Sequence, residues 1–327
     1  MHYYGHGANL SKMIEWGTEE KKWDYVGVGY AIRAWGWLTL TNMYGEAILR
    51  QAFDPNRLVF DYDSQEDIYA ETRRMCHTAI EFLSKTGDGV SQANLALGDA
   101  FFYNGDVNKW KKFCYSVLAR SFNHLTNKAS YNPDSVIYYA NLGILDNADN
   151  ASAKFAATGL SGTYNFFGPF RGNVGALRQS RFMANLMTGL NPTFISVNDP
   201  RAPYLIRENT NGTYRGVRPN KGTDALATND QPRNFWGGIF TSTAAPGTDV
   251  DCRYIFRNGS PFPIITAAEV HFMKAEAYLR KGPAFAAQAR QSYIDGINAS
   301  FDMLTGTADY HNSVPGAMQI TPGVKAA

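Results

Sequence analysis

The chain has 327 residues and a formal net charge of +2, with 44% hydrophobic and 18% charged residues. This composition excludes an intrinsically disordered chain and leaves ample length for a core. The small net charge gives no electrostatic reason to expect binding to nucleic acid or to an anionic membrane surface, and no apolar run reaches the roughly 18 residues of a membrane-spanning helix.

The N-terminal region begins irregularly and then becomes helical. Residues 1–20 read as a loop. Residues 22–44 form a long helical pattern that Gly45 ends. One face of this helix is expected to carry Val26, Tyr30, Arg33, Trp37, Leu40 and Tyr44. An extended connection follows over 54–63.

Three further helices are predicted before residue 146, each with a polar residue at its start. Their expected starts are Ser64 in a capping box with Asp67, Asp106 before a helix through Leu125, and Asn132-Pro133 before a helix that ends near Gly143.

Residues 146–262 differ in character, because they are rich in Gly, Asn, Thr, Pro and aromatic residues and show little helical period. We expect a single helix over 175–188 among many turns. A long irregular segment inside a helical scaffold is more often functional than accidental. A cluster of oxygen-bearing side chains could contact calcium but is more typical of a turn; it comprises Asp146, Asn147, Asp149 and Asn150.

The clearest pattern is a helix pair over 263–304. Thr266 and Glu269 have the spacing of a reciprocal capping box. Gly282 ends the first helix, and Pro283 can begin the second. The expected apolar stripes are Ala268, Phe272, Ala275 and Leu279, and then Phe285, Ala289, Tyr293 and Ile297. Two antiparallel helices on a short turn form a tetratricopeptide-like unit, which must stack on others to bury its apolar face.

Several sequence segments resemble, in their order along the chain, segments of the SusD/RagB family of nutrient-binding outer-membrane lipoproteins of Bacteroidetes-type bacteria. The matching segments are "YAIRAWGWLTLTNMYGEAILRQAF" (30–53), "YDSQEDIYAE" (62–71), "GDAFFYNGDVNKWKKFCYSVLARSFNHL" (98–125), "NDPR" (198–201), "AEVHFMKAEAYLRKG" (268–282) and "YIDGINASF" (293–301). The resemblance implies a mainly α fold, in which tetratricopeptide-like helix pairs form a platform that carries a long irregular loop-rich insertion.

For domain organisation, we expect one SusD-like domain over 1–327. Its helical platform is placed at about 22–145 and 263–304, and its irregular ligand-facing region at about 146–262. The resemblance also implies an export signal and a lipid-bearing cysteine that are not found here, and the pattern fades after residue 304, so we expect truncation at both ends. The three cysteines cannot all pair within one chain, and Cys76 and Cys114 lie in helical patterns, where burial is expected.

Two aromatic loops form the candidate ligand-binding surface: "SGTYNFFGPFRG" (161–172) and "QPRNFWGGIF" (231–240). A sugar ring has an apolar face and a polar edge, so an aromatic ring flanked by Asn or Arg meets both needs. The candidate residues are Trp236, Phe235, Tyr164, Phe167, Phe170, Arg171 and Tyr214. Trp236 is the first choice, because Gly237 and Gly238 would leave its surroundings open to a ligand. The alternative for each ring is an anchor that holds its loop onto the helices.

Enzyme signatures are absent from the sequence. It contains no zinc-binding His-Glu-x-x-His, no phosphate-binding P-loop and no Gly-x-Ser-x-Gly elbow. Gly27-Val-Gly29 lies within the first helix, without the preceding strand of a dinucleotide fingerprint. We therefore expect no metal site, no cofactor and no catalytic residue, although paired carboxylates for glycoside hydrolysis remain open because their separation is spatial.

Three functions are compatible with the sequence. The resemblance implies a non-catalytic, lipid-anchored protein on the exterior of the outer membrane that captures an oligosaccharide, or in some members a peptide, for a SusC-like TonB-dependent transporter. The first alternative is a glycoside hydrolase on a helical scaffold, which would release reducing ends. The second is a repeat adaptor that binds only protein, which would show no affinity for glycans or short peptides.

Overall fold

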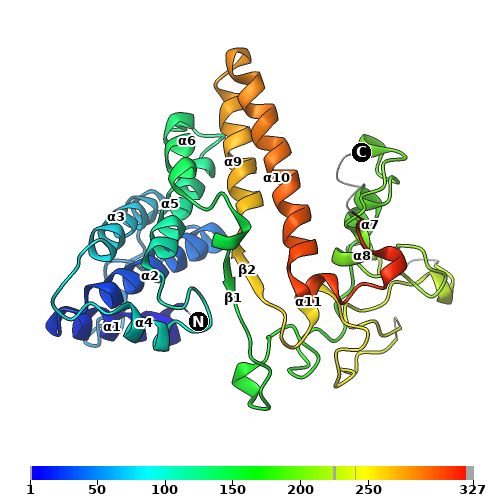
Figure 1. The fold of residues 1–327 in the computed structure, drawn as a ribbon, viewed down its shortest axis with the longest axis horizontal. Coiled ribbons are helices and arrows are strands. Elements are labelled where there is room, and N and C mark those ends of the chain that lie inside the picture. The colour runs from blue at the N-terminus through cyan, green and yellow to red at the C-terminus, as the bar shows by residue number, and fades with distance from the viewer. Residues whose placement is uncertain (1, 224–225, 240, 322–327) are drawn as a thin grey trace. The chain divides into compact units, whose positions relative to one another are not determined.

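The computed structural model describes residues 2–223, 226–239 and 241–321, and its fold is mainly α, as predicted (Figure 1). The α-helices are α1 (Gly7–Glu19), α2 (Trp23–Tyr44), α3 (Gln65–Leu83), α4 (Gln92–Gly98), α5 (Val107–Asn123), α6 (Pro133–Leu142), α7 (Arg181–Met187), α8 (Ala202–Leu205), α9 (Ala267–Arg280), α10 (Ala286–Gly306) and α11 (Ala308–His311). Two short strands, β1 (Ala151–Ala153) and β2 (Phe262–Ile265), pair with each other. No helix among the described residues combines the length and the apolar character that a membrane span needs.

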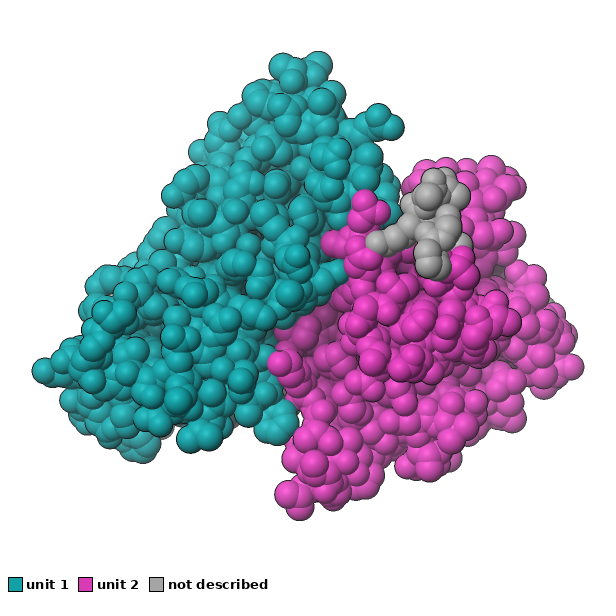
Figure 2. Space-filling view, viewed as in Figure 1, with its two compact units in different colours: residues 1–151, 264–297 teal, residues 152–263, 298–327 magenta. Residues whose placement is uncertain are grey.

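The chain divides into two compact units (Figure 2). Unit 1 comprises residues 1–151 and 264–297, and unit 2 comprises residues 152–263 and 298–327. These bounds lie near those predicted for the helical platform and the irregular region. That both units form one domain stays a prediction.

Unit 1 begins with helix where the sequence predicted a loop, and that prediction is wrong. A π-helical turn (His2–His6) leads into α1, which packs against α2. Glycines of α2 lie at its contacts with the neighbouring helices, and a glycine adds nothing to an apolar sequence pattern. A Cβ on Gly29 would lie 2.8 Å from Ile14 Cγ1, and a Cβ on Gly27 would lie 2.6 Å from Leu83 Cγ of α3. Gly27-Val-Gly29 therefore lets α1 and α3 approach α2 closely.

The predicted helix starts in unit 1 are confirmed. Ser64 Oγ accepts from Asp67 N (3.1 Å), and Asp106 Oδ1 accepts from Asn108 N (2.9 Å). Asn132 likewise caps α6, which ends before Gly143. These hydrogen bonds satisfy backbone N–H groups that have no partner within the helix.

The capping box of α9 forms only in part. Thr266 Oγ1 accepts from Glu269 N (3.3 Å), as predicted. The carboxylate of Glu269 instead receives two hydrogen bonds from Arg120 of α5, at 2.6 and 2.7 Å. Arg120 also donates to Ile264 O (2.9 Å). Glu269 thus joins α9 to α5, because a guanidinium binds a carboxylate more strongly than a backbone N–H does.

The predicted apolar stripe of α9 is wrong at its end, because Leu279 is 68% exposed. The most deeply buried side of α9 instead carries Ala267, Val270, Met273 and Ala277, and the helix packs against α5 and α6. Gly282 has φ +107°, and Pro283 starts a 3₁₀ turn rather than α10 itself. A Cβ on Gly296 of α10 would lie 2.8 Å from the Phe272 ring, so this glycine admits the ring.

Unit 2 is irregular, as predicted, but the helix expected over 175–188 is shorter. It begins only at Arg181, because Gly175 takes the left-handed φ of +42° and Ser180 Oγ caps the helix by accepting from Met183 N (3.1 Å). In the same unit Tyr310 of α11 is buried and donates to Pro261 O (2.6 Å).

Candidate functional site

One buried amide holds the aromatic loop 161–172 in place. Asn165 is fully buried, and its Nδ2 donates to Ile255 O (2.6 Å), Arg257 O (3.0 Å) and Ser260 O (3.2 Å). Its Oδ1 accepts from the backbone N of Phe167 (3.0 Å). The Asn165 side chain therefore ties the loop to the segment 255–260, and Asn258 Oδ1 of that segment also accepts from Phe170 N (2.9 Å).

The same loop presents aromatic rings at the surface of unit 2. Phe166 and Phe170 are each 47% exposed. Tyr164 stacks on Phe170, with ring centroids 3.9 Å apart and planes 14° from parallel. The Arg171 guanidinium carbon lies 5.8 Å from the Phe166 centroid, and Nη1 donates to Ser161 O (3.1 Å).

This arrangement combines flat apolar faces with a cation and several hydrogen-bonding groups. Stacking leaves one face of each ring uncovered by its partner. A sugar unit can lie on such a face while its hydroxyls reach polar groups at the rim. The loop therefore has the chemistry of a carbohydrate-binding surface.

The expectation that Trp236 is open to a ligand is wrong. Its ring is 1% exposed and packs in a core with Val174 and Cys252, and its Nε1 donates to Phe167 O (2.9 Å). The neighbouring glycine is not open either, because a Cβ on Gly237 would lie 2.7 Å from Asp251 Cβ. A large indole ring gains most by burial where its N–H finds an acceptor.

Three other predicted residues also take part in packing. Phe235 stacks on Phe256 with centroids 4.2 Å apart, and Phe167 stacks on Phe262 at 5.3 Å. Tyr214 packs against a separate core of unit 2, where burial raises the pKa of its hydroxyl to about 12. These half-buried rings match the alternative weighed for each of them, an anchor for a loop.

The structure thus brings together Tyr164, Phe170 and Arg171 and separates them from the buried Trp236 core. It adds Phe166, which was not among the candidate residues. The sequence shows Phe166 and Phe167 side by side and cannot tell which of them faces solvent, because the loop has no regular period.

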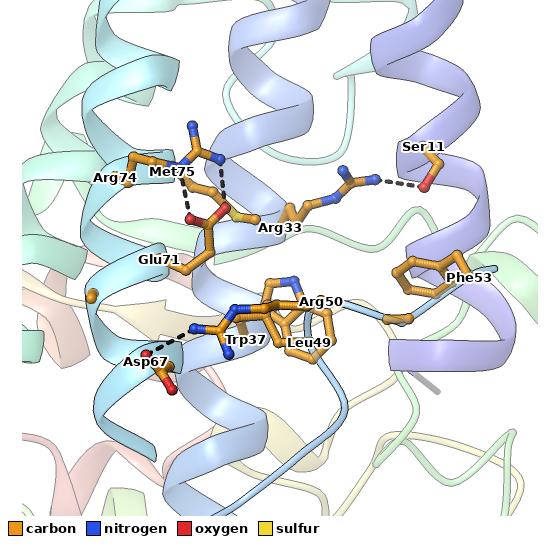
Figure 3. Close-up of a pocket in the computed structure, with 12 residues that line it drawn as sticks. Ser11, Arg33, Trp37, Leu49, Arg50, Phe53, Asp67, Glu71, Arg74 and Met75 are labelled. Atoms are coloured by element: carbon orange, nitrogen blue, oxygen red, sulfur yellow. Dashed lines mark hydrogen bonds and ion pairs between the residues drawn. The ribbon is translucent and has the colours of Figure 1, made fainter. Parts of the chain in front are cut away.

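A cavity in unit 1 has a volume of about 640 Å³ and lies among α1, α2, α3 and the loop 49–53 (Figure 3). Its charges are mostly paired with one another. Arg74 Nε donates to Glu71 (2.7 Å), and Arg50 Nη2 lies 2.9 Å from Asp67. Arg33 differs, because its Nη2 donates to Ser11 Oγ (2.8 Å) and burial lowers its pKa. Paired charges have little left to offer a ligand.

The oxygen-rich cluster at 146–150 forms a turn. Asp146 Oδ1 accepts from Ala148 N (2.7 Å), Asp149 pairs with Lys112, and Asn150 Oδ1 accepts from Ala267 N (2.7 Å). Across the residues that the structure describes, no group of three or more His, Cys, Asp or Glu side chains could hold a metal ion. The three cysteines are buried and unpaired, which confirms the expectation for Cys76 and Cys114.

Comparison with known proteins gives a family match over nearly the whole chain. Residues 1–319 match the SusD-like_2 family model, described as starch-binding and associating with the outer membrane. No curated protein matches the chain by sequence.

Solved structures share the fold. A chitin-binding SusD homologue from Flavobacterium johnsoniae is 18% identical, with a TM-score of 0.62 over 92% of this chain and 57% of that one. A SusD homologue from Bacteroides uniformis is 24% identical, with a TM-score of 0.66 over 90% and 56%. A SusD/RagB family protein from Bacteroides thetaiotaomicron is 21% identical, with a TM-score of 0.64 over 99% and 65%. The chain therefore spans less than two thirds of the length of these relatives.

Proposed function

Because the chain belongs to the SusD-like family of starch-binding proteins that associate with the outer membrane, we propose that it captures a nutrient oligosaccharide at the cell surface without altering it. The observation that carries this proposal is the surface of loop 161–172, where Phe166 and Phe170 are half exposed and Tyr164 stacks on Phe170.

The roles of these side chains follow from their positions. Phe166 and Phe170 offer their exposed faces to sugar rings. Tyr164 holds Phe170 in orientation and is itself held by Gly159 N, which donates to its hydroxyl oxygen (3.2 Å). Arg171 donates to sugar hydroxyls at the edge of the surface. Trp236 supports the loop from beneath by its bond to Phe167 O.

The captured oligosaccharide would be handed to a TonB-dependent outer-membrane transporter of the SusC type, with the protein held on the exterior by an N-terminal lipid anchor. Family membership supports both parts. Co-purification of the chain with a co-expressed TonB-dependent barrel transporter of the SusC type would test the partnership, and separate elution of the two proteins would contradict it.

Calorimetric titration with oligosaccharides from starch and from chitin tests the binding proposal. We expect the double variant Phe166→Ala/Phe170→Ala to lose about tenfold to a hundredfold in affinity, since each ring contact is worth roughly 0.5–1.5 kcal/mol. Tyr44→Ala is the matched control, because Tyr44 is 75% exposed on unit 1 and should leave affinity unchanged.

Chromatography of the titrated mixture separates capture from hydrolysis. Recovery of the intact oligosaccharide supports a binding protein. Release of shorter products would favour the hydrolase. Binding of short peptides but of no oligosaccharide would favour the peptide-binding alternative within the same family.

A further inference from the structure

Unit 2 contains an open groove with a volume of about 410 Å³, formed by the start of α7 and by the turns at 191–192 and 218–221. The side chains that matter in its lining are Arg181, Phe182, Asn185, Asn191, Arg218 and Lys221. Among the lining residues that the structure describes, none carries a carboxylate.

The backbone brings these segments together closely. Arg181 N donates to Val217 O (2.8 Å), and Ser180 pairs with Val217 as an isolated parallel bridge. A Cβ on Gly216 would lie 2.2 Å from Ser180 O, so only glycine allows this approach. Lys221 N donates to Arg218 O (3.1 Å) within a turn that Gly222 closes at φ +58°. The groove is therefore built by hydrogen bonds of the main chain.

The groove holds positive charge that the described protein does not neutralise. Neither Arg181 nor Lys221 forms an ion pair with any residue that the structure describes. In unit 2, by contrast, Arg253 is engaged by Glu208 in two hydrogen bonds of 2.8 Å. Cations gathered in a groove whose described lining has no carboxylate attract an anionic ligand.

Two further features point to a sugar rather than to a bare anion. The Phe182 ring is 68% exposed beside the cations, so it can stack on the apolar face of a pyranose. Asn185 and Asn191 place amides in the lining. Asn191 Oδ1 already accepts from Thr193 N (2.9 Å), which leaves its NH2 group to donate to ligand oxygens.

We propose that this groove binds an acidic unit of the captured saccharide, a sugar that bears a carboxylate or a sulfate group. Arg181 binds the anionic group through its planar fork of N–H donors, Lys221 adds charge, and Phe182 stacks on the ring. This inference rests on the proposed function and narrows its ligand class to acidic glycans. Uronate and sulfate share the chemistry that the groove recognises, and the experiment separates them.

The test compares affinity for neutral maltohexaose with affinity for an oligogalacturonate and a sulfated oligosaccharide of similar length. We expect at least one acidic ligand to bind about tenfold or more tightly than the neutral one at about 0.1 M salt. That preference should shrink at about 1 M salt, where the Debye length falls from roughly 10 Å to roughly 3 Å. The ligand with the larger preference identifies the anionic group.

The variant Arg181→Gln/Lys221→Gln should abolish the preference and leave any affinity for the neutral ligand unchanged. Arg290→Gln, which removes an exposed cation from the unit 1 part of α10, should retain the preference. Circular dichroism and the neutral-ligand affinity show whether the double variant is folded.

Each outcome has a defined consequence. Binding of neutral and acidic ligands with equal affinity, or a preference that survives in the Arg181→Gln/Lys221→Gln variant, overturns this inference and leaves the proposed function standing. Binding of acidic ligands that needs Arg181 and Lys221 but not Phe166 and Phe170 supports the groove and contradicts the role of loop 161–172. Binding of none of the saccharides contradicts both proposals.

Discussion

Replacing Asn165 by alanine tests whether one buried amide positions the ligand-binding loop. The side chain is fully buried and bridges loop 161–172 to three carbonyls of residues 255–260, while its Oδ1 accepts from Phe167 N. The two hydrogens of Nδ2 support two strong donor bonds, and the third contact shares one of them.

The expected cost follows from that inventory. The substitution removes two donor bonds and one acceptor bond, each worth about 1 kcal/mol net, and leaves buried carbonyls and a buried N–H without partners. We therefore expect Asn165→Ala to lower the free energy of unfolding by about 3–4 kcal/mol. Because the loop loses one of its anchors, oligosaccharide affinity should fall as well.

Urea-induced unfolding followed by intrinsic fluorescence measures the stability change. Limited proteolysis reports opening of loop 161–172. Asn173→Ala is the matched control in a neighbouring position, because Asn173 is exposed and donates to Phe166 O (2.9 Å). It should cost about 0.5 kcal/mol or less. A loss below about 1 kcal/mol for Asn165→Ala, together with unchanged affinity and proteolysis, would refute the anchoring role.

Two other predictions concern stability. Gly27→Ala places a methyl group 2.6 Å from Leu83 Cγ and 2.9 Å from Leu83 N, so chemical denaturation should show a free energy of unfolding that is lower by about 1–3 kcal/mol. Gly306→Ala is the control, because that position has open space around it and the substitution should not lower stability. Equal stability of the two variants would contradict the packing argument. For Glu208, burial acts to raise the carboxyl pKa, but the hydrogen bonds from Arg253 and the charge of Arg207 outweigh it and hold that pKa below its ordinary value. The stability that this pair provides is present above the ordinary carboxyl pKa of 4.5 and is lost as the pH falls through the lower value of the folded state. Glu208→Gln should therefore lower the free energy of unfolding by about 3 kcal/mol at neutral pH, because it leaves the buried Arg253 without a charged partner. The difference from the unmodified protein should shrink in acid. A difference in stability that does not change with pH would count against the pairing.

Local patterns account for the features that were predicted correctly. Ser64, Asp106 and Thr266 each cap a helix through a hydrogen bond that spans two or three residues, so the signal and its partner lie in the same short stretch of sequence. Gly45 and Gly282 end helices with positive φ for the same kind of reason.

Features that were mispredicted depend on partners far away in the chain. Leu279 has the right spacing for a buried stripe, but the neighbouring helices cover a different side of α9. Glu269 prefers the guanidinium of Arg120, which is 149 residues away. The N-terminal helix α1 packs closely on α2 at Gly29, and a glycine contributes nothing to an apolar pattern.

In the aromatic loops, the sequence identifies the aromatic residues, and the tertiary structure determines which of them are exposed. The sequence singled out the loops 161–172 and 231–240 by their clustered aromatic residues. Only the folded chain decided that Trp236 is buried while Phe166 and Phe170 are exposed. The physical reason is that an irregular loop has no period to orient its side chains, so each ring's exposure depends on which distant backbone groups, such as the carbonyls around Asn165, hold the loop in place.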